Sequence, residues 1–423
     1  MAHCLGRGIT MNGLGKGLGN NSGKNSGNNS CKDSSAPFGE GIRQTLAGKT
    51  VVLAITGSIA AVEVVKLARA LRRKGAKVQA VMSDAAAGII TPDAVTYACD
   101  TPAITKITGN IEHVKFCGIG GIGDVLLIAP ATANTISKIA CGIDDTPVTT
   151  FATTAIGRGM PVVIAPAMHE SMYNHPAVVE NIRKLRDFGI TFVDPFMAEN
   201  KAKFASNDEI VLEVERAVCG KPLLNKKVII TGGACREALD DVRVLTTRSG
   251  GRMGRELALE AYRLGADVTY VHGGDGVAGV RNVTTESAED MQSAVLNAIK
   301  GGCDFYISAA AVSDYKPERV AGKISSNMDI SVKLLPLPKI LDAVVNALAG
   351  AGGGAKIAAF KLGDDADEKA EKMVAAGIDL VCANAAVNMG AEGGRYGLHT
   401  KDGVFEVCGT KEETAGEIWR RLL

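Results

Sequence analysis

HVKFCGIGGIGDVLLIAPATANTISKIACGIDD, residues 113–145, contains the strongest structural signal in the chain. The apolar run Val125–Ile128 predicts a buried strand, and the small residues of Ala129–Thr135 predict a tight turn directly into a helix. An open α/β sheet binds its ligand at such a turn, because the positive end of the helix points outward there. Three residues of the turn are therefore candidate ligand contacts: Ala131, Thr132 and Asn134.

Strands and helices alternate on both sides of this turn. Upstream, Val51–Ile55 is a predicted strand, followed by a glycine turn and a helix over Val62–Arg73. Downstream, Val162–Ala165 and Ile190–Val193 are predicted strands, with a polar helix between them near residues 177–188. Alternation at this pace is typical of a doubly wound parallel sheet.

The same pattern restarts after a break at Cys219–Pro222. Lys227–Thr231 predicts a strand, Ser249–Gly254 opens a helix, and Val268–Val271 predicts the next strand. We therefore expect an α/β protein with two tandem doubly wound (Rossmann-like) parallel sheets. The expected divisions are a glycine-, asparagine- and serine-rich disordered tail over 1–44, a first domain over 45–220 and a second over 221–423.

Composition excludes several classes of function. The chain has 423 residues and a formal net charge of +1, which indicates neither nucleic acid nor a charged membrane surface as a partner. No uninterrupted apolar stretch is long enough to span a bilayer. The ten cysteines form no C-x-x-C pair, which favours a reducing, cytoplasmic compartment.

Glycine and hydroxyl side chains also follow the first two predicted strands. Gly57 has no Cβ to obstruct a phosphate, and the hydroxyl groups of Ser58 and Ser83 stand at strand ends beside helix amides. None of these strand-to-helix turns carries the dinucleotide fingerprint G-x-G-x-x-G. Together with the turn at Ala129–Thr135, they predict a mononucleotide site in the first domain.

These motifs resemble the homo-oligomeric flavin-containing cysteine decarboxylases. The matching segments are TGSIAA (56–61), SDAA (83–86), ITP (90–92), EH (112–113), APATANTISKIACGIDD (129–145) and PAMHESMY (166–173). The resemblance implies FMN bound between subunits and oxidative decarboxylation of a C-terminal cysteine or a phosphopantothenoyl-cysteine. It also implies that His113 is the active-site histidine and that Met168 and His169 belong to a segment that clamps the substrate.

Three departures from that family pattern stand out. His169 replaces an asparagine; it can still donate a hydrogen bond to a carboxylate, but its charge depends on pH. The flap that commonly carries a cysteine reads ENKAKFA over 199–205, so another group must protonate the intermediate. Lys201 and Lys203 are candidates, and a solvated basic loop is the alternative reading. The glycine-rich segment Gly118–Gly123 is also longer than expected.

The second domain is similar to phosphopantothenate-cysteine ligases. The matching segments are TGGACRE (231–237), DVR (241–243), TRSGGRMG (247–254), AAVSDY (310–315), GKI (322–324), PKIL (338–341), FK (360–361) and DLVCAN (379–384). Fusion of such a domain behind a flavin domain is the organisation of the bifunctional ligase–decarboxylases of coenzyme A synthesis. The resemblance covers all but the tail and implies 4′-phosphopantothenate, L-cysteine and CTP as substrates, with Mg²⁺ or another divalent cation accompanying CTP.

The resemblance also implies roles in the ligase. Thr247 stands where an asparagine usually handles the acyl-nucleotide intermediate. Asp314 and Lys323 match CTP contacts, Phe360 matches a residue near the base, and Lys372 matches one of two triphosphate lysines, the other position being Ala376. Further substrate contacts are implied at Ala310, Pro338, Lys339, Ile340 and Leu341. The sequence identifies no metal ligands.

We therefore expect a bifunctional enzyme that joins 4′-phosphopantothenate to cysteine through an acyl-cytidylate and then decarboxylates the product to 4′-phosphopantetheine. Two alternatives remain open at this point: a ligase fused to a non-decarboxylating flavin-binding or regulatory domain, and a related flavoprotein acting on another substrate, such as a flavin prenyltransferase. The resemblance also implies homo-oligomers, trimeric through the flavin domains and dimeric through the ligase domains, up to a dodecamer.

Overall fold

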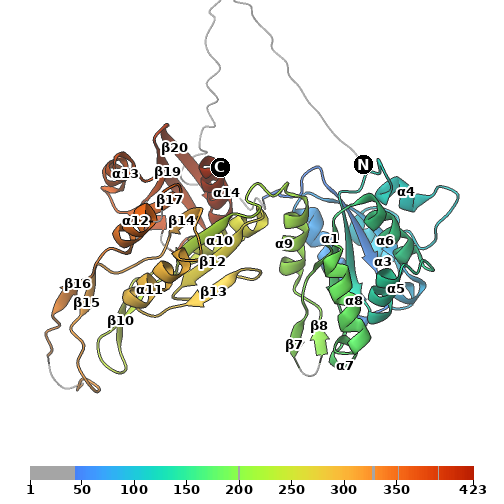
Figure 1. Cartoon of the computed structure of the whole chain (residues 1–423), viewed down its shortest axis with the longest axis horizontal. Coiled ribbons are helices and arrows are strands. Elements are labelled where there is room, and N and C mark those ends of the chain that lie inside the picture. Colours follow the sequence, from blue (N-terminus) through green and yellow to red (C-terminus); the bar gives the residue numbers. More distant parts are fainter. Residues whose placement is uncertain (1–42, 199–200, 326–328, 351, 389) are drawn as a thin grey trace, which may run out of the picture. The chain divides into compact units, whose positions relative to one another are not determined.

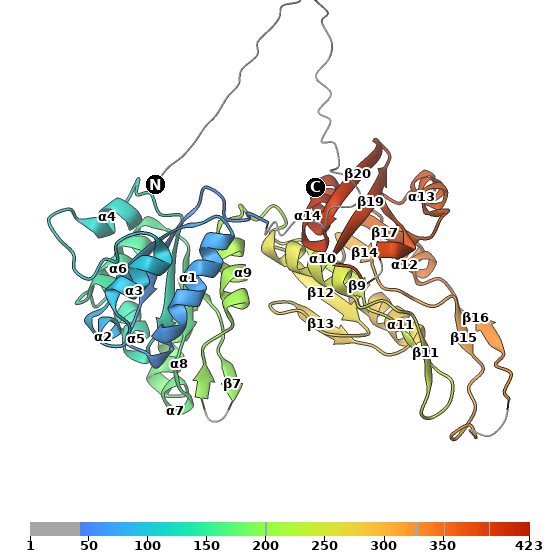
Figure 2. The same ribbon diagram turned by 180° about the vertical axis from the view of Figure 1, so that it is seen from behind.

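The computed structural model describes residues 43–198, 201–325, 329–350, 352–388 and 390–423. Side chains are not described at 196–198, 201–203 and 386. The predicted pair of doubly wound α/β domains is confirmed (Figure 1; Figure 2 shows the same ribbon from behind). Each domain is built around its own sheet, and the predicted tail lies almost wholly outside the described residues.

The sheet of the first domain has five parallel strands in the order β2-β1-β3-β4-β6. Their bounds are β1 (Thr50–Ile55), β2 (Lys77–Met82), β3 (Val125–Ala131), β4 (Val162–Pro166) and β6 (Thr191–Phe192). This is the flavodoxin-like order, in which the chain reverses its direction of growth between β1 and β3. Ligands of such sheets bind at that reversal, outside the carboxyl ends of the strands.

Helices cover both faces of this sheet. Successive side chains of a strand point to opposite faces, so Val51, Leu53 and Ile55 pack with α1, α3 and α9, whereas Val52 and Ala54 pack with α4, α5, α6 and α8. The bounds are η1 (Ile59–Glu63), α1 (Val64–Arg73), α2 (Asp84–Ala87), α3 (Pro92–Cys99), α4 (Glu112–Cys117), α5 (Ala133–Cys141), α6 (Pro147–Arg158), α7 (Glu170–Tyr173), α8 (Pro176–Asp187) and α9 (Asn207–Val218).

Two details of the first domain differ from the sequence expectation. The helix expected from Val62 begins with a 3-10 turn over Ile59–Glu63, and its α-helical part starts at Val64. The short helix α4, which carries His113, was not expected, because the glycines that follow it obscure its periodicity. Of the helices that the structure describes, none is long and apolar enough to cross a membrane.

The sheet of the second domain has eight strands in the order β13-β12-β9-β14-β17-β18-β19-β20. The bounds are β9 (Lys227–Gly232), β12 (Asp267–His272), β13 (Arg281–Thr284), β14 (Phe305–Ser308), β17 (Lys356–Leu362), β18 (Leu380–Asn384), β19 (Gly393–Thr400) and β20 (Gly403–Thr410). The first six are parallel in the Rossmann order, and β19 and β20 extend one edge as an antiparallel hairpin.

Helices also cover both faces of the second sheet. Helices α10 (Arg252–Arg263) and α14 (Lys411–Leu422) pack on one face, around the fully buried Trp419. Helices α11 (Ala288–Ile299), α12 (Ile340–Gly350) and α13 (Ala366–Ala375) pack on the other, and η2 (Ala386–Asn388) precedes β19.

Three small antiparallel sheets complete the chain. In the first domain, β5 (Met168–His169), β8 (Lys201–Lys203) and β7 (Phe196–Ala198) form a sheet in that order. In the second, β10 (Arg236–Ala238) pairs with β11 (Val244–Thr246), and β15 (Tyr315–Pro317) pairs with β16 (Leu334–Pro336). The last two ribbons extend from the same domain, with β10 beside β15 (Figures 1 and 2).

Candidate functional site

The carboxyl ends of three neighbouring strands gather the predicted cofactor residues of the first domain. Gly57 and Ser58 follow β1, Ser83 follows β2, Ala131 ends β3 and Thr132 follows it. The strand order β2-β1-β3 brings these three turns side by side. We call this arrangement the strand-end cradle.

Hydrogen bonds connect the turns of the strand-end cradle. The Thr56 hydroxyl donates to the carbonyl of Pro130 at 2.7 Å and accepts from the amide of Thr132 at 3.0 Å. Thr132 also caps α5, where its hydroxyl accepts from the amide of Thr135 at 3.3 Å. The turn that follows β1 and the N-terminus of α5 are therefore held together, with Asn134 exposed in the first turn of that helix.

Gly57 leaves no room for a side chain in the strand-end cradle. A Cβ at this position would lie 2.5 Å from Cβ of Ala85. The Ser58 hydroxyl makes no capping hydrogen bond, whereas Ser83 caps α2 by accepting from the amide of Ala86. A glycine turn beside the amides of a helix N-terminus suits a phosphate, so these residues fit the phosphate group of FMN.

His113 is the second residue of α4 and faces Phe151 of helix α6. Its ring meets that of Phe151 edge-on, at 6.4 Å between centroids and an interplanar angle of 66°. The Nδ1 atom is buried and has no hydrogen-bond partner among the described residues. A buried polar atom without a partner is unusual, and it leaves Nε2 as the ring nitrogen available to a ligand. No described hydrogen bond connects His113 to the strand-end cradle of its own chain.

Met168 and His169 form β5, which pairs with the flap strand β8: Met168 faces Ala202, and His169 faces Lys201. The Nδ1 atom of His169 accepts a hydrogen bond from the amide of Ser171 at 3.3 Å. Because Nδ1 is an acceptor, Nε2 carries the proton and remains a donor for an anionic group. The side chains of Lys201 and Lys203 lie outside the described part.

In the second domain, Thr247 and Ala311 meet at the carboxyl ends of β9 and β14. The Thr231 hydroxyl accepts from the amide of Ala310 at 3.3 Å. The amide of Ala311 donates to the carbonyl of Gly233 at 2.8 Å, and the Thr247 hydroxyl donates to the carbonyl of Ala311 at 3.4 Å. Two segments of the expected ligase site, more than sixty residues apart in the sequence, are therefore in direct contact.

Asp314 and Lys339 form an ion pair beside this contact. The amide of Leu337 donates to the carbonyl of Asp314 at 2.9 Å, which fixes Pro338 and Lys339 just before α12. Ile340 is buried in the core under α12, and Leu341 packs against the same core. Lys323 is exposed, in a segment that contacts the turn between β10 and β11.

Comparison with known proteins places this geometry in a family. The family model described as Flavoprotein matches residues 42–218, and that of the DNA/pantothenate metabolism flavoprotein C-terminal domain matches 223–423. The coenzyme A biosynthesis bifunctional protein CoaBC of Thermococcus kodakarensis is 45% identical over 389 residues, 89% of this chain and 95% of that protein. The chain belongs to the CoaBC family.

Solved structures also match parts of this chain. The crystal structure of the C-terminal domain of a coenzyme A biosynthesis bifunctional protein CoaBC is 30% identical and covers 48% of this chain and 96% of that one, with a TM-score of 0.40. The FMN-dependent cysteine decarboxylase SpaF is 28% identical and covers 40% of this chain and 99% of that one, with a TM-score of 0.36.

Membership of the CoaBC family decides among the readings of the sequence. The expectation of a bifunctional enzyme of coenzyme A biosynthesis, with a decarboxylase domain before a ligase domain, is confirmed. The two alternatives, a flavin domain without decarboxylase activity and a flavoprotein for another substrate, are not favoured. The flavoprotein character of the first domain is likewise confirmed.

Two expected ligase residues are not brought to the contact between Thr247 and Ala311. Lys372 lies on α13 and pairs with Glu368 one turn earlier at 2.5 Å. Phe360 packs against the core under α10 and α14, the opposite face of the sheet from α13. The structure therefore does not place these two side chains together within one chain.

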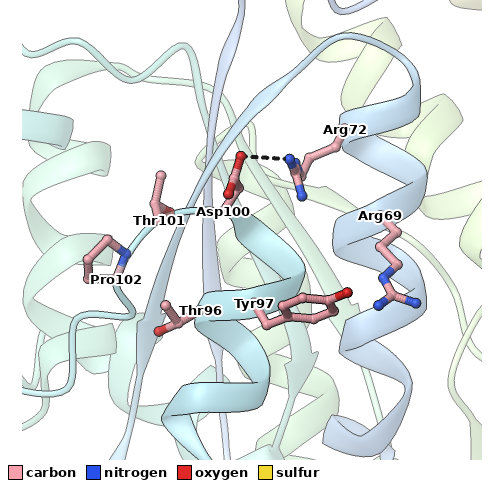
Figure 3. Close-up of a pocket in the computed structure, with 7 residues that line it drawn as sticks. All are labelled: Arg69, Arg72, Thr96, Tyr97, Asp100, Thr101 and Pro102. Atoms are coloured by element: carbon pink, nitrogen blue, oxygen red, sulfur yellow. Dashed lines mark hydrogen bonds and ion pairs between the residues drawn. The ribbon is translucent and has the colours of Figure 1, made fainter. Parts of the chain in front are cut away.

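A cavity of about 540 Å³ opens between α1 and α3, away from both candidate sites (Figure 3). Arg72 pairs with Asp100 at 2.9 Å, and the guanidinium of Arg69 lies 5.4 Å from the ring centre of the exposed Tyr97. The cavity is lined by the last turns of the two helices. Since β2 starts just after α1 ends, the cavity lies near the amino end of β2. The strand-end cradle lies at the opposite, carboxyl ends of the strands.

Sequence reasoning missed the buried carboxyl of Asp240, which follows β10. Burial raises the pKa of Asp240, but hydrogen bonds from three backbone amides and the Arg243 guanidinium together lower it to about 2. The neighbouring DVR motif could have indicated this ion pair, because Arg243 stands only three residues after Asp240. Among the described residues, no cluster of three histidine, cysteine or acidic side chains could hold a metal ion.

Proposed function

We propose that this enzyme joins 4′-phosphopantothenate to L-cysteine with CTP and then decarboxylates the product to 4′-phosphopantetheine with bound FMN. In the first reaction the substrate carboxylate attacks the α-phosphate of CTP and expels pyrophosphate. The cysteine amine then displaces CMP from the acyl-cytidylate. The observation that carries the proposal is the presence of two separate nucleotide-type sites at strand ends in one chain: the strand-end cradle and the contact between Thr247 and Ala311.

The expected ligase site in the second domain offers groups suited to this chemistry. Lys323 and Lys339 supply positive charge, and Thr247 supplies a hydroxyl group next to the backbone of Ala311. Preorganised charges of this kind stabilise the negative charge that develops during attack on a phosphate. We include Mg²⁺ or another divalent cation with CTP, because the triphosphate carries several negative charges that a metal ion neutralises.

In the first domain, Gly57, Ser58, Ser83, Thr132 and Asn134 would hold FMN. When bound, FMN supplies a two-electron oxidation of the cysteinyl group and returns the same electrons after carbon dioxide has left, so the overall reaction needs no other oxidant. His113 presents Nε2 for proton transfer, since its Nδ1 is buried. His169 donates through Nε2 to the substrate carboxylate, since its Nδ1 already accepts from Ser171.

The proposal extends to assembly. The resemblance to the homo-oligomeric flavin-containing cysteine decarboxylases supports a flavin site shared between subunits. We therefore propose trimeric flavin domains and dimeric ligase domains, up to a dodecamer. We also propose the domain division at residue 220 and a cytoplasmic location, on the sequence patterns described above.

The test is to incubate the purified full chain with 4′-phosphopantothenate, cysteine, CTP and Mg²⁺ and to follow the products by mass. The wild type should yield 4′-phosphopantetheine, and His113→Asn should stop at phosphopantothenoylcysteine. His175→Asn is the matched control, because His175 is an exposed histidine of the same domain that only caps α8. A wild type that stops at phosphopantothenoylcysteine would contradict the decarboxylase half, and one that makes neither product would contradict the ligase half.

A further inference from the structure

The turn between β10 and β11 is bonded to the segment that carries Lys323. Asp241 and Gly322 exchange two hydrogen bonds: the Gly322 amide donates to the Asp241 carboxylate at 3.1 Å, and the Asp241 amide donates to the Gly322 carbonyl at 3.2 Å. Arg319 pairs with the same carboxylate at 2.8 Å. The backbone on the N-terminal side of Lys323 is therefore held from the hairpin turn.

Asp240 holds the other side of Lys323. Its side chain is fully buried, and its carboxylate accepts from the amide of Ile324 at 3.1 Å. The same carboxylate accepts from the amides of Val242 and Arg243 at 2.8 and 2.6 Å. The Arg243 guanidinium donates both to Asp240, at 2.8 Å, and to the carbonyl of Ile324, at 3.2 Å. Two consecutive aspartates thus bind the two amides that flank one lysine.

Lys323 itself is left free by this arrangement. Its side chain is exposed, and its ammonium group makes no hydrogen bond or ion pair with any residue that the structure describes. When an exposed lysine binds a ligand, both its backbone and its side chain lose conformational freedom. A backbone that is already fixed removes the first part of that cost. The hairpin turn also leads through β11 to Thr247, so it connects two predicted parts of the ligase site.

We propose that Asp240 and Asp241 are positioning residues of the ligase, which hold the backbone at Gly322 and Ile324 so that the Lys323 ammonium group meets the nucleotide phosphates. The inference rests on the proposed ligase function and adds to it the device that orients the lysine. Asp241 is the better probe of the two, because half of its side chain is exposed and, among the described residues, its carboxylate bonds only to Arg319 and Gly322. Asp240 also stabilises its own hairpin.

The experiment is a double-mutant cycle on the full chain with Asp241→Ala and Lys323→Ala. We expect Asp241→Ala to lower kcat/KM for CTP about tenfold, as loss of a hydrogen bond to a charged group does. In the Lys323→Ala background the same change should have almost no further effect, because the group that it positions is absent. Asp241→Asn keeps an acceptor oxygen for the Gly322 amide and should restore most of the activity.

Asp304→Ala is the matched control. The Asp304 carboxylate also accepts a backbone amide, that of Lys227 at 2.8 Å, and pairs with Lys226 at 3.1 Å. It lies at the amino end of β14, whereas the expected ligase site lies at the carboxyl ends of the strands of the same sheet. Asp304→Ala should therefore lower stability to a similar extent but leave kcat/KM for CTP unchanged.

The possible outcomes separate the inference from the proposed function. If Asp241→Ala lowers kcat/KM equally with and without Lys323, the aspartate does not act through the lysine and the inference is overturned. An equal loss of kcat/KM in Asp304→Ala would also overturn it, because a general loss of stability would then explain the effect. A wild type without ligase activity would instead overturn the proposed function.

Discussion

Gly57→Ala tests the strand-end cradle by filling it with one methyl group. The new Cβ would lie 2.5 Å from Cβ of Ala85 and 3.2 Å from its carbonyl carbon. Two carbon atoms pack best at about 3.5 to 4.0 Å, so the chain must open by about 1 Å to accept the substitution. We expect the protein to move Ala85 and, with it, the cap that Ser83 makes on α2.

The magnitude follows from the cost of overpacking. One excess methyl group in a tightly packed place costs about 1–3 kcal/mol of unfolding free energy. The displacement occurs at the residues proposed to hold FMN, so the flavin content of the purified protein should fall together with the stability. A change in flavin content without a change in stability is not expected, because both come from the same contact.

Chemical denaturation and visible flavin absorbance measure the two effects. Adding Ala85→Gly removes the Cβ that clashes, so the double variant should recover most of the loss seen in Gly57→Ala. Gly157→Ala is the matched control, since Gly157 is an exposed residue of α6 and its Cβ would meet no atom within 4 Å. That control should gain about 0.5–1 kcal/mol, the advantage of alanine over glycine inside a helix.

The reasoning would be refuted if Gly57→Ala retained wild-type flavin content and stability. It would also be refuted if Ala85→Gly gave no recovery in the double variant, because the loss would then not come from this contact. Loss of flavin in the Gly157→Ala control would show that flavin content does not report on the cradle.

Three further measurements address other parts of the fold. Because the folded pKa of Asp240 lies below its ordinary value of 3.8, its carboxylate stabilises the protein above that pH, and the stability difference between wild type and Asp240→Asn should shrink as pH falls from 3.8 to about 2. Trp419→Ala should cost about 3–5 kcal/mol in urea denaturation, because the ring is fully buried against Phe305 and donates to the carbonyl of Leu257; a cost below about 1 kcal/mol would contradict this packing. Ser206→Ala removes half of the capping box with Glu209 and should cost about 1 kcal/mol, whereas Ser206→Asp should cost less; equal losses would argue against the cap.

The central strands of both sheets could be predicted from sequence with little ambiguity. Val125–Ile128 and Lys227–Thr231 became β3 and β9 because an interior parallel strand is covered on both faces and so appears as a continuous apolar run. The turns after them were also predictable, because glycine accepts the backbone angles of a turn and serine and threonine hydroxyl groups bond to nearby backbone amides.

The edges of the fold were harder to predict. The antiparallel hairpin of β19 and β20 has no strong pattern, because β19 is mostly buried without strict alternation and the edge strand β20 is mostly exposed. Helix α4 is short and is stabilised by packing against α6 rather than by its own sequence, so its six residues showed no periodicity.

The sequence alone thus determined the central strands, the turns that follow them and the family motifs, because these depend on local chemistry and on short repeats. Contacts across long loops were decided only by the tertiary structure. Asp240 and Ile324 are 84 positions apart, and no local preference brings them together. Lys372 is the opposite case: it pairs with Glu368 four residues earlier on the same helix, which is a local contact, although its sequence position matched a triphosphate contact. Which partner a charged side chain finds depends on how the sheet brings distant segments into contact, and that follows from burying the two faces of each sheet at once.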